Sequence, residues 1–121
     1  MTPQRETRAY LWDVIEACDA VAEYIAGADL ARYSSERQLR ASVEREVFIM
    51  GEAVNSIRKQ EPLAVHVLGD VAGIIEVRNI LGHAYFIVKH DRMWDVATKH
   101  VPRLRAAAKE WLDTFHQESR P

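Results

Sequence analysis

The stretch LWDVIEACDAVAEYI, residues 11–25, carries the pattern that decides the fold class. Its apolar residues recur every three or four positions, which places them in one stripe along a helix. They are Leu11, Val14, Ile15, Cys18, Val21, Ala22 and Ile25. Pro3 suits the first turn of such a helix, and Gly27 suits its end. The pattern therefore predicts a helix from about residue 3 to 26.

A second helix is expected after a polar link through residues 29–34. Ser35, with Gln38 three positions later, is typical of a capping box, so the helix is predicted to begin there and to run to about Lys59. Gly51 lies inside it. A glycine within a helix costs about 1 kcal/mol against alanine, so its presence indicates close packing against another helix.

The remainder of the chain predicts two more helical segments. The first covers about residues 63–86, breaks near Gly69 and is interrupted again by Gly82. The last is expected to be capped by Asp91 and to run to about residue 116, with a kink at Pro102 because proline lacks the backbone donor. The sequence therefore predicts an all-α protein. We expect a four- to five-helix up-and-down bundle that forms a single domain over residues 1–121.

Composition limits the functions that such a bundle can have. With 121 residues, of which 48% are hydrophobic, the chain can bury one core but is short for a deep cleft of its own, which favours a site between subunits. A net charge of −2 means that any contact with RNA must come from a local patch. The single cysteine, Cys18, is expected to be a buried apolar residue rather than a reactive thiol.

Metal binding and membrane insertion are both unexpected. The sequence has no cluster of cysteine and histidine that would hold zinc, so no metal or other cofactor is predicted. It also has neither a signal-peptide pattern nor an apolar run long enough to span a bilayer. We therefore expect a cytoplasmic protein.

The segment RNILGHAY, residues 78–85, combines side chains that suit the cleavage of RNA. RNA carries its own nucleophile, the ribose 2'-hydroxyl, so an enzyme that cleaves it has to move protons and to stabilise negative charge on phosphorus. His83 suits the first task because histidine changes its charge near neutral pH. Arg78 suits the second because its planar fork matches phosphate oxygens.

Spacing alone leaves the role of this segment open. Arg78 and His83 would lie about 140° apart on a regular helix, so either Gly82 loosens the helix or the pair meets the same pair of a second chain. Asn79 is equally suited to orienting His83, to binding phosphate or to capping the local backbone. The structural alternative is a helix end stabilised by His83, with Tyr85 packed against the last helix and Arg78 in a surface ion pair, for example with Glu76 or Glu52.

A resemblance to a known family favours the catalytic interpretation. Arg78, His83 and Tyr85 match the Arg-x4-His-x-Tyr motif of the HepT-like toxins, and Arg78-Asn79 matches the start of the wider HEPN ribonuclease motif. Other stretches resemble the same family in the same order, from about residue 5 to 112. They are DVIEA at 13–17, YIAG at 24–27, IMGEA at 49–53, MWD at 93–95 and VPRL at 101–104.

The resemblance implies a HEPN-like bundle that dimerises through the motif-bearing region. It implies metal-independent endoribonuclease activity with Arg78 and His83 as the essential pair and Asn79 in a supporting role. It also implies a type VII-like HEPN/MNT toxin–antitoxin system. In that setting a minimal nucleotidyltransferase antitoxin of the MntA type silences the toxin by adding AMP to the motif tyrosine, here Tyr85. The alternative is a non-catalytic helical dimer that binds a nucleotide or a partner nucleotidyltransferase.

Overall fold

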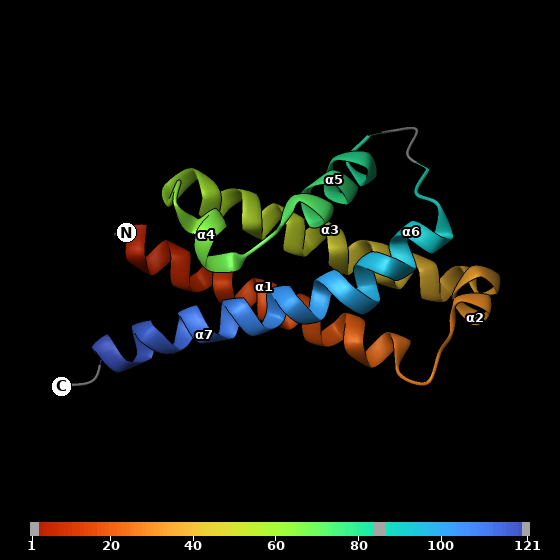
Figure 1. Cartoon of the computed structure of the whole chain (residues 1–121), viewed down its shortest axis with the longest axis horizontal. Helices are drawn as coiled ribbons and strands as arrows, with labels where there is room; N and C mark the ends of the chain where they lie inside the picture. Colours follow the sequence, from red (N-terminus) through yellow and green to blue (C-terminus); the bar gives the residue numbers. More distant parts are fainter. Residues whose placement is uncertain (1–2, 84–86, 120–121) are drawn as a thin grey trace.

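A computed structural model describes residues 3–83 and 87–119, and all the regular secondary structure in these ranges is helical. The elements are α1 (Pro3–Ile25), α2 (Leu30–Ser35), α3 (Arg37–Gln60), α4 (Ala64–Leu68), α5 (Ala72–Leu81), α6 (His90–Asp95), the π-helical turn η1 (Val96–His100) and α7 (Val101–Ser119). Figure 1 shows the chain reversing direction from α1 to α3, to α5, and to the continuous run of α6, η1 and α7. The prediction of an all-α, up-and-down bundle is confirmed.

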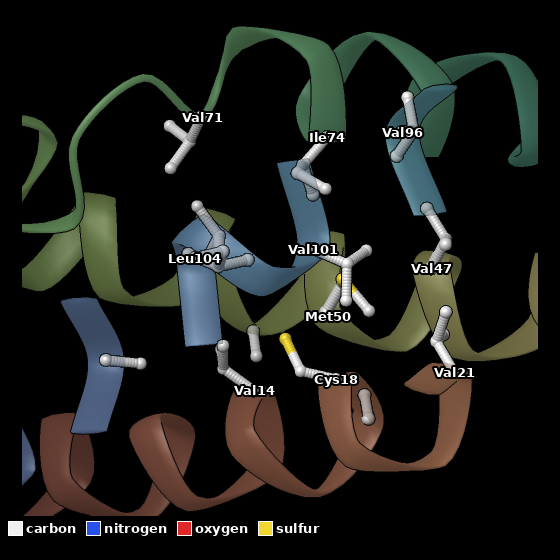
Figure 2. Packing of buried hydrophobic residues seen from close by; sticks show 14 of the residues in the cluster. Val14, Cys18, Val21, Val47, Met50, Val71, Ile74, Val96, Val101 and Leu104 are labelled. Carbon is white, nitrogen blue, oxygen red and sulfur yellow. The ribbon is translucent and has the colours of Figure 1, made fainter. Parts of the chain in front are cut away.

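Helix α3 lies at the centre of the arrangement. It packs along α1 on one side and carries α5 on another, while α7 crosses α1 (Figure 1). One buried apolar cluster joins these helices, and Figure 2 shows Val14 and Cys18 of α1 facing Met50 of α3 and Val101 at the start of α7. Five residues of the stripe predicted for the first helix belong to this cluster, namely Leu11, Val14, Ile15, Cys18 and Val21.

The expected capping box at Ser35 is wrong. Ser35 ends the short helix α2 and its hydroxyl donates to the Arg32 carbonyl at 3.1 Å, while Glu36 precedes α3 without a side-chain cap. Helix α2 forms where a link was expected. The Asp29 carboxylate caps its N-terminus by accepting a hydrogen bond from the Arg32 backbone N–H at 2.8 Å.

The last helix also begins earlier than predicted. It starts at His90, and Asp91 lies in the first turn, where its carboxylate accepts from the Arg92 backbone N–H at 2.8 Å. The irregularity expected at Pro102 takes the form of η1 directly before it, where the Val101 N–H reaches the Val96 carbonyl. Such a single π-helical turn is a common way to accommodate a local break in the α-helical ladder.

The break predicted in the third segment is confirmed. Gly69 has a φ of 75°, a value that favours glycine, and it separates α4 from α5. The Asp70 carboxylate accepts from the Ala72 N–H at 3.0 Å at the start of α5. Within the described ranges, no helix is both long and apolar enough to cross a bilayer.

Cys18 lies in the core with 1% of its surface exposed, and burial raises the pKa of its thiol to about 12. Because the thiolate is the reactive form, we expect alkylation of the folded protein at pH 8 to be about 1000-fold slower than that of an ordinary thiol. Iodoacetamide labelling followed by mass spectrometry measures the rate. The double variant Cys18→Ala, Ala31→Cys, which carries one exposed thiol, is the control. Equal labelling rates for the two proteins would contradict the prediction.

Candidate functional site

The stem of Arg78 on α5 lies directly against Gly51 of α3. Gly51 is buried at this crossing, and a Cβ atom at its position would come within 2.6 Å of Arg78 Cγ and closer still to Arg78 Cβ. Any side chain at position 51 would therefore displace the stem of Arg78. The expectation that Gly51 permits close helix packing is confirmed, and the structure adds that the residue it admits is Arg78.

Three side chains hold the guanidinium of Arg78. Its Nε donates to Glu52 Oε1 at 2.5 Å, and its Nη2 forms an ion pair with the same oxygen. Its Nη1 donates to Asn79 Oδ1 at 2.9 Å. Its Cζ lies 5.8 Å from the centroid of the Phe48 ring, within the range of a cation–π contact. The ion pair with Glu52, one of the two partners considered from the sequence, is present, and the arginine side chain remains 30% exposed.

His83 lies just beyond the end of α5. Gly82 is the C-cap, and its N–H reaches the Arg78 carbonyl at 3.0 Å with a φ of −78°, so no left-handed backbone is needed there. The His83 N–H donates to the Ile80 carbonyl at 3.2 Å, and the residue is exposed. Helical geometry therefore stops before His83, and its side chain is free of the 140° offset that a continuous helix would impose. Among the hydrogen bonds of the described residues, none joins Arg78 to His83.

Of the other predicted site residues, Asn79 is described by the structure and Tyr85 is not. Asn79 acts on its neighbour in the chain, since its side-chain carbonyl accepts from Arg78, a role that the sequence did not suggest. Tyr85 lies in the segment 84–86, outside the described residues. Phe48 was missed as a site residue. Its spacing from Gly51 and Glu52, at positions i, i+3 and i+4 of one helix, is the signal that places all three on one face.

The basic residues that follow the motif are engaged elsewhere. Arg92 forms ion pairs with Glu76, at 3.5 Å between Nη2 and Oε2, and with Asp95, at 3.7 Å between Nη1 and Oδ2. The Asp95 pKa is lowered, chiefly by a hydrogen bond from Lys99, with His100 and Arg92 adding to the effect. The His90 ring meets the ring of Tyr33 edge-on, with 6.3 Å between centroids. These contacts form a separate, largely neutralised group around α6 and η1.

The surface beside Arg78 is open rather than enclosed. A shallow hollow of about 370 Å³ lies on one side of Phe48, and a second, of about 360 Å³, lies on the other and reaches Glu52. The first is lined by Ala41, Glu44, Arg45, Phe48 and Leu81, and burial raises the pKa of the Glu44 carboxyl. In the part of the chain that the structure describes, no group of three His, Cys, Asp or Glu residues is placed to hold a metal ion.

Comparison with known proteins assigns this chain to a family. The pattern of the family described as "Ribonuclease HepT-like" matches residues 14–111, which include α5 and the Arg78–His83 segment. The chain belongs to the HepT-like ribonuclease family. The resemblance seen in the sequence is thereby confirmed.

Relatives of similar length support the assignment. A protein of Methanocaldococcus jannaschii named "Putative RNase" is 26% identical over 106 residues, which cover 84% of this chain and 93% of that protein. A protein of Caldanaerobacter subterraneus with the same designation is 28% identical over 107 residues, covering 87% of this chain and 93% of that one. No solved structure matches the chain with significance. The relatives' names point to a ribonuclease at the level of the family.

The crossing at Gly51 gives a first test of the site geometry. In Gly51→Ala, the new methyl group would overlap Arg78 Cβ and Cγ, so we expect a loss of about 1 to 3 kcal/mol of stability from overpacking. Urea unfolding followed by circular dichroism measures the loss. Gly82→Ala is the matched control, because a Cβ there would meet its nearest neighbour at 3.4 Å, an ordinary contact. Equal stability of Gly51→Ala and the unmodified protein would refute the close crossing.

Proposed function

We propose that this protein is a metal-independent endoribonuclease in which Arg78 and His83 carry the reaction. The observation that supports this most directly is the placement of Arg78. Its partly exposed side chain is held by its neighbours at an open surface, and His83 is exposed five residues later, just past the helix end. Both residues fall inside the span that matches a ribonuclease family.

Each residue has a defined part in the proposed reaction. The ribose 2'-hydroxyl attacks the adjacent phosphorus and the bond from phosphorus to the 5'-oxygen of the next nucleotide breaks, which gives a cyclic phosphate and a free 5'-hydroxyl. Arg78 stabilises the extra negative charge on the phosphate oxygens as the attack proceeds. His83 transfers protons as general acid or base, since its imidazole changes protonation state near neutral pH.

A homodimer through the motif-bearing region completes the proposed site. One chain offers only an open surface at Arg78, with shallow hollows beside Phe48. A two-fold axis near α5 would bring two copies of Arg78 and His83 to one RNA strand and would also close the site against water. Ile87, which is 86% exposed directly after the undescribed segment, adds apolar surface to this region.

The cleavage itself is tested with labelled RNA in EDTA at neutral pH. We expect the unmodified protein to cleave, and Arg78→Ala and His83→Ala each to lose at least about 100-fold in rate, because each removes a group that acts in the transition state. Arg58→Ala, which removes an exposed arginine on α3 bonded to Asn55, is the matched control and should cleave as the unmodified protein does.

Two outcomes of that assay would contradict the proposal. Absence of cleavage by the purified protein would favour a non-catalytic helical dimer that binds a nucleotide or a partner nucleotidyltransferase. Cleavage that survives in Arg78→Ala would assign the activity to other residues or to a contaminant.

Family membership further supports a place in a type VII-like HEPN/MNT toxin–antitoxin system in the cytoplasm. The proposed partner is an MntA-like minimal nucleotidyltransferase that adds AMP to Tyr85. Each AMP group would bring a negative phosphodiester and a bulky nucleoside two residues from His83. It would thereby fill the space in which the RNA phosphate binds and would neutralise the positive charge that binds this phosphate.

This regulation predicts a mass change. Co-expression with the cognate nucleotidyltransferase should add about 329 Da, or a multiple of it, as AMP on the tyrosine oxygen. Intact-mass spectrometry measures the adduct, and Tyr85→Phe, which lacks that oxygen, should carry none. Tyr24→Phe, at an exposed tyrosine near the end of α1, is the control that should keep the adduct. An identical adduct on the Tyr85→Phe protein would sink the assignment.

A further inference from the structure

Arg78 is held by a face of α3 that lies outside the arginine–histidine motif. Phe48, Gly51 and Glu52 stand at positions i, i+3 and i+4, and so share one side of the helix. Gly51 makes room for the stem of Arg78, Phe48 lies against the guanidinium, and Glu52 bonds its side. We call these three residues the arginine seat.

The contacts of the seat determine which N–H donors of Arg78 stay available for a ligand. An arginine guanidinium has five N–H donors in a fixed plane. Glu52 Oε1 lies between Nε and Nη2 and takes the side edge of the plane, and Asn79 Oδ1 takes a hydrogen of Nη1. Among the contacts of the described residues, one hydrogen of Nη1 and one of Nη2 remain without an acceptor. The outer edge of the guanidinium carries one hydrogen from each Nη atom, and the Nη2 hydrogen on that edge is among those left over.

An outer edge with one hydrogen from each Nη atom is a fork that matches two oxygens of a phosphate. We propose that the arginine seat, and Glu52 above all, is a positioning device that aims the outer edge of Arg78 at the scissile phosphate of RNA. This rests on the proposed ribonuclease function and adds to it a residue that sets the direction of the fork. An arginine without such support loses side-chain conformational entropy when it binds phosphate. In an arginine held by the seat, that entropy has already been lost on folding, so it does not oppose binding.

A contrasting role for Glu52 makes different predictions. If its carboxylate acted only by its charge, it would compete with phosphate for Arg78, and its removal would strengthen RNA binding and speed cleavage. If it positions the guanidinium, what matters is an oxygen acceptor at the right reach. The two roles therefore separate charge from geometry, and conservative variants of Glu52 distinguish them.

The test compares three substitutions in the EDTA cleavage assay. Glu52→Gln keeps the length and an acceptor oxygen without the charge, Glu52→Asp keeps the charge but is one methylene shorter, and Glu52→Ala loses both. Positioning predicts that Glu52→Gln stays within about 3-fold of the unmodified kcat, whereas Glu52→Asp and Glu52→Ala lose about 10- to 100-fold, the scale of a misplacement near 1 Å. Glu46→Gln, on the same helix as Glu52, is the matched control and should leave kcat unchanged.

The opposite ranking would overturn the proposal. Faster cleavage by Glu52→Ala and Glu52→Gln, with Glu52→Asp unchanged, would show competition by charge. If kcat is unchanged in all three variants while Arg78→Ala is inactive, the positioning role of the seat is refuted and the ribonuclease proposal is unaffected. Thermal unfolding of each variant separates a loss of folded protein from a loss of rate.

A second readout does not depend on RNA cleavage. In an 15N-edited NMR spectrum, the Nε–H of Arg78, assigned through its absence in Arg78→Lys, should exchange slowly with water because it donates to Glu52. We expect this protection to persist in Glu52→Gln and Glu46→Gln and to disappear in Glu52→Ala. If the protein cleaves no RNA, protection still establishes the seat. If Glu52→Ala keeps the protection, the seat is refuted whatever the cleavage result.

Discussion

The crossing of α5 over α3 at Gly51 is the contact on which the rest of the site depends. An arginine next to a helix crossing normally needs space that the packed side chains would otherwise fill. Here the missing Cβ of Gly51 leaves that space, and the stem of Arg78 occupies it. Because the backbones approach closely at this point, the direction in which Arg78 leaves α5 is set by packing before any polar contact is made.

Electrostatics then complete what packing begins. A partly buried guanidinium loses hydration and must recover hydrogen bonds from nearby groups. Glu52 and Asn79 supply them, and the face of Phe48 lies against the cation. Because the arginine side chain is about one third exposed and Glu52 about one half, screening by solvent makes the pair a modest source of stability. Its main effect is to fix direction, since an acceptor on the side edge leaves the outer edge free.

The sequence predicts the helices well because each long helix carries an apolar stripe that repeats around the turn. It fails where two caps compete over a few residues. Asp29 caps α2 and Ser35 closes it, although the spacing of Ser35 and Gln38 suited a capping box. Asp91 gave a similar false signal at the start of α6, because an acidic residue suits both a cap and a first turn. A single cap contributes only about 0.5 to 2 kcal/mol, so the choice between two caps a few residues apart depends on small differences in local free energy.

The sequence indicated the candidate residues of the site and one of their contacts. Glu52 was one of two partners considered for Arg78, and Gly51 indicated a close crossing, but the sequence did not show that Arg78 lies at that crossing. This placement depends on the register in which α5 lies on α3, which the buried faces of both helices decide together. Phe48 was missed because an apolar ring suits a helix interface as well as it suits contact with a cation.

The seat also reconciles a phosphate-directed site with an acidic chain. A protein that binds RNA through many surface cations shows a strong dependence on salt and a basic surface. This chain has a net charge of −2, and Arg92, which follows the motif, is paired with Glu76 and Asp95. Recognition then has to come from the geometry of a few donors rather than from accumulated charge. A guanidinium satisfies that requirement when a carboxylate neutralises its side edge and its outer edge points in a fixed direction. It then binds a phosphate well in one orientation and only weakly in other orientations.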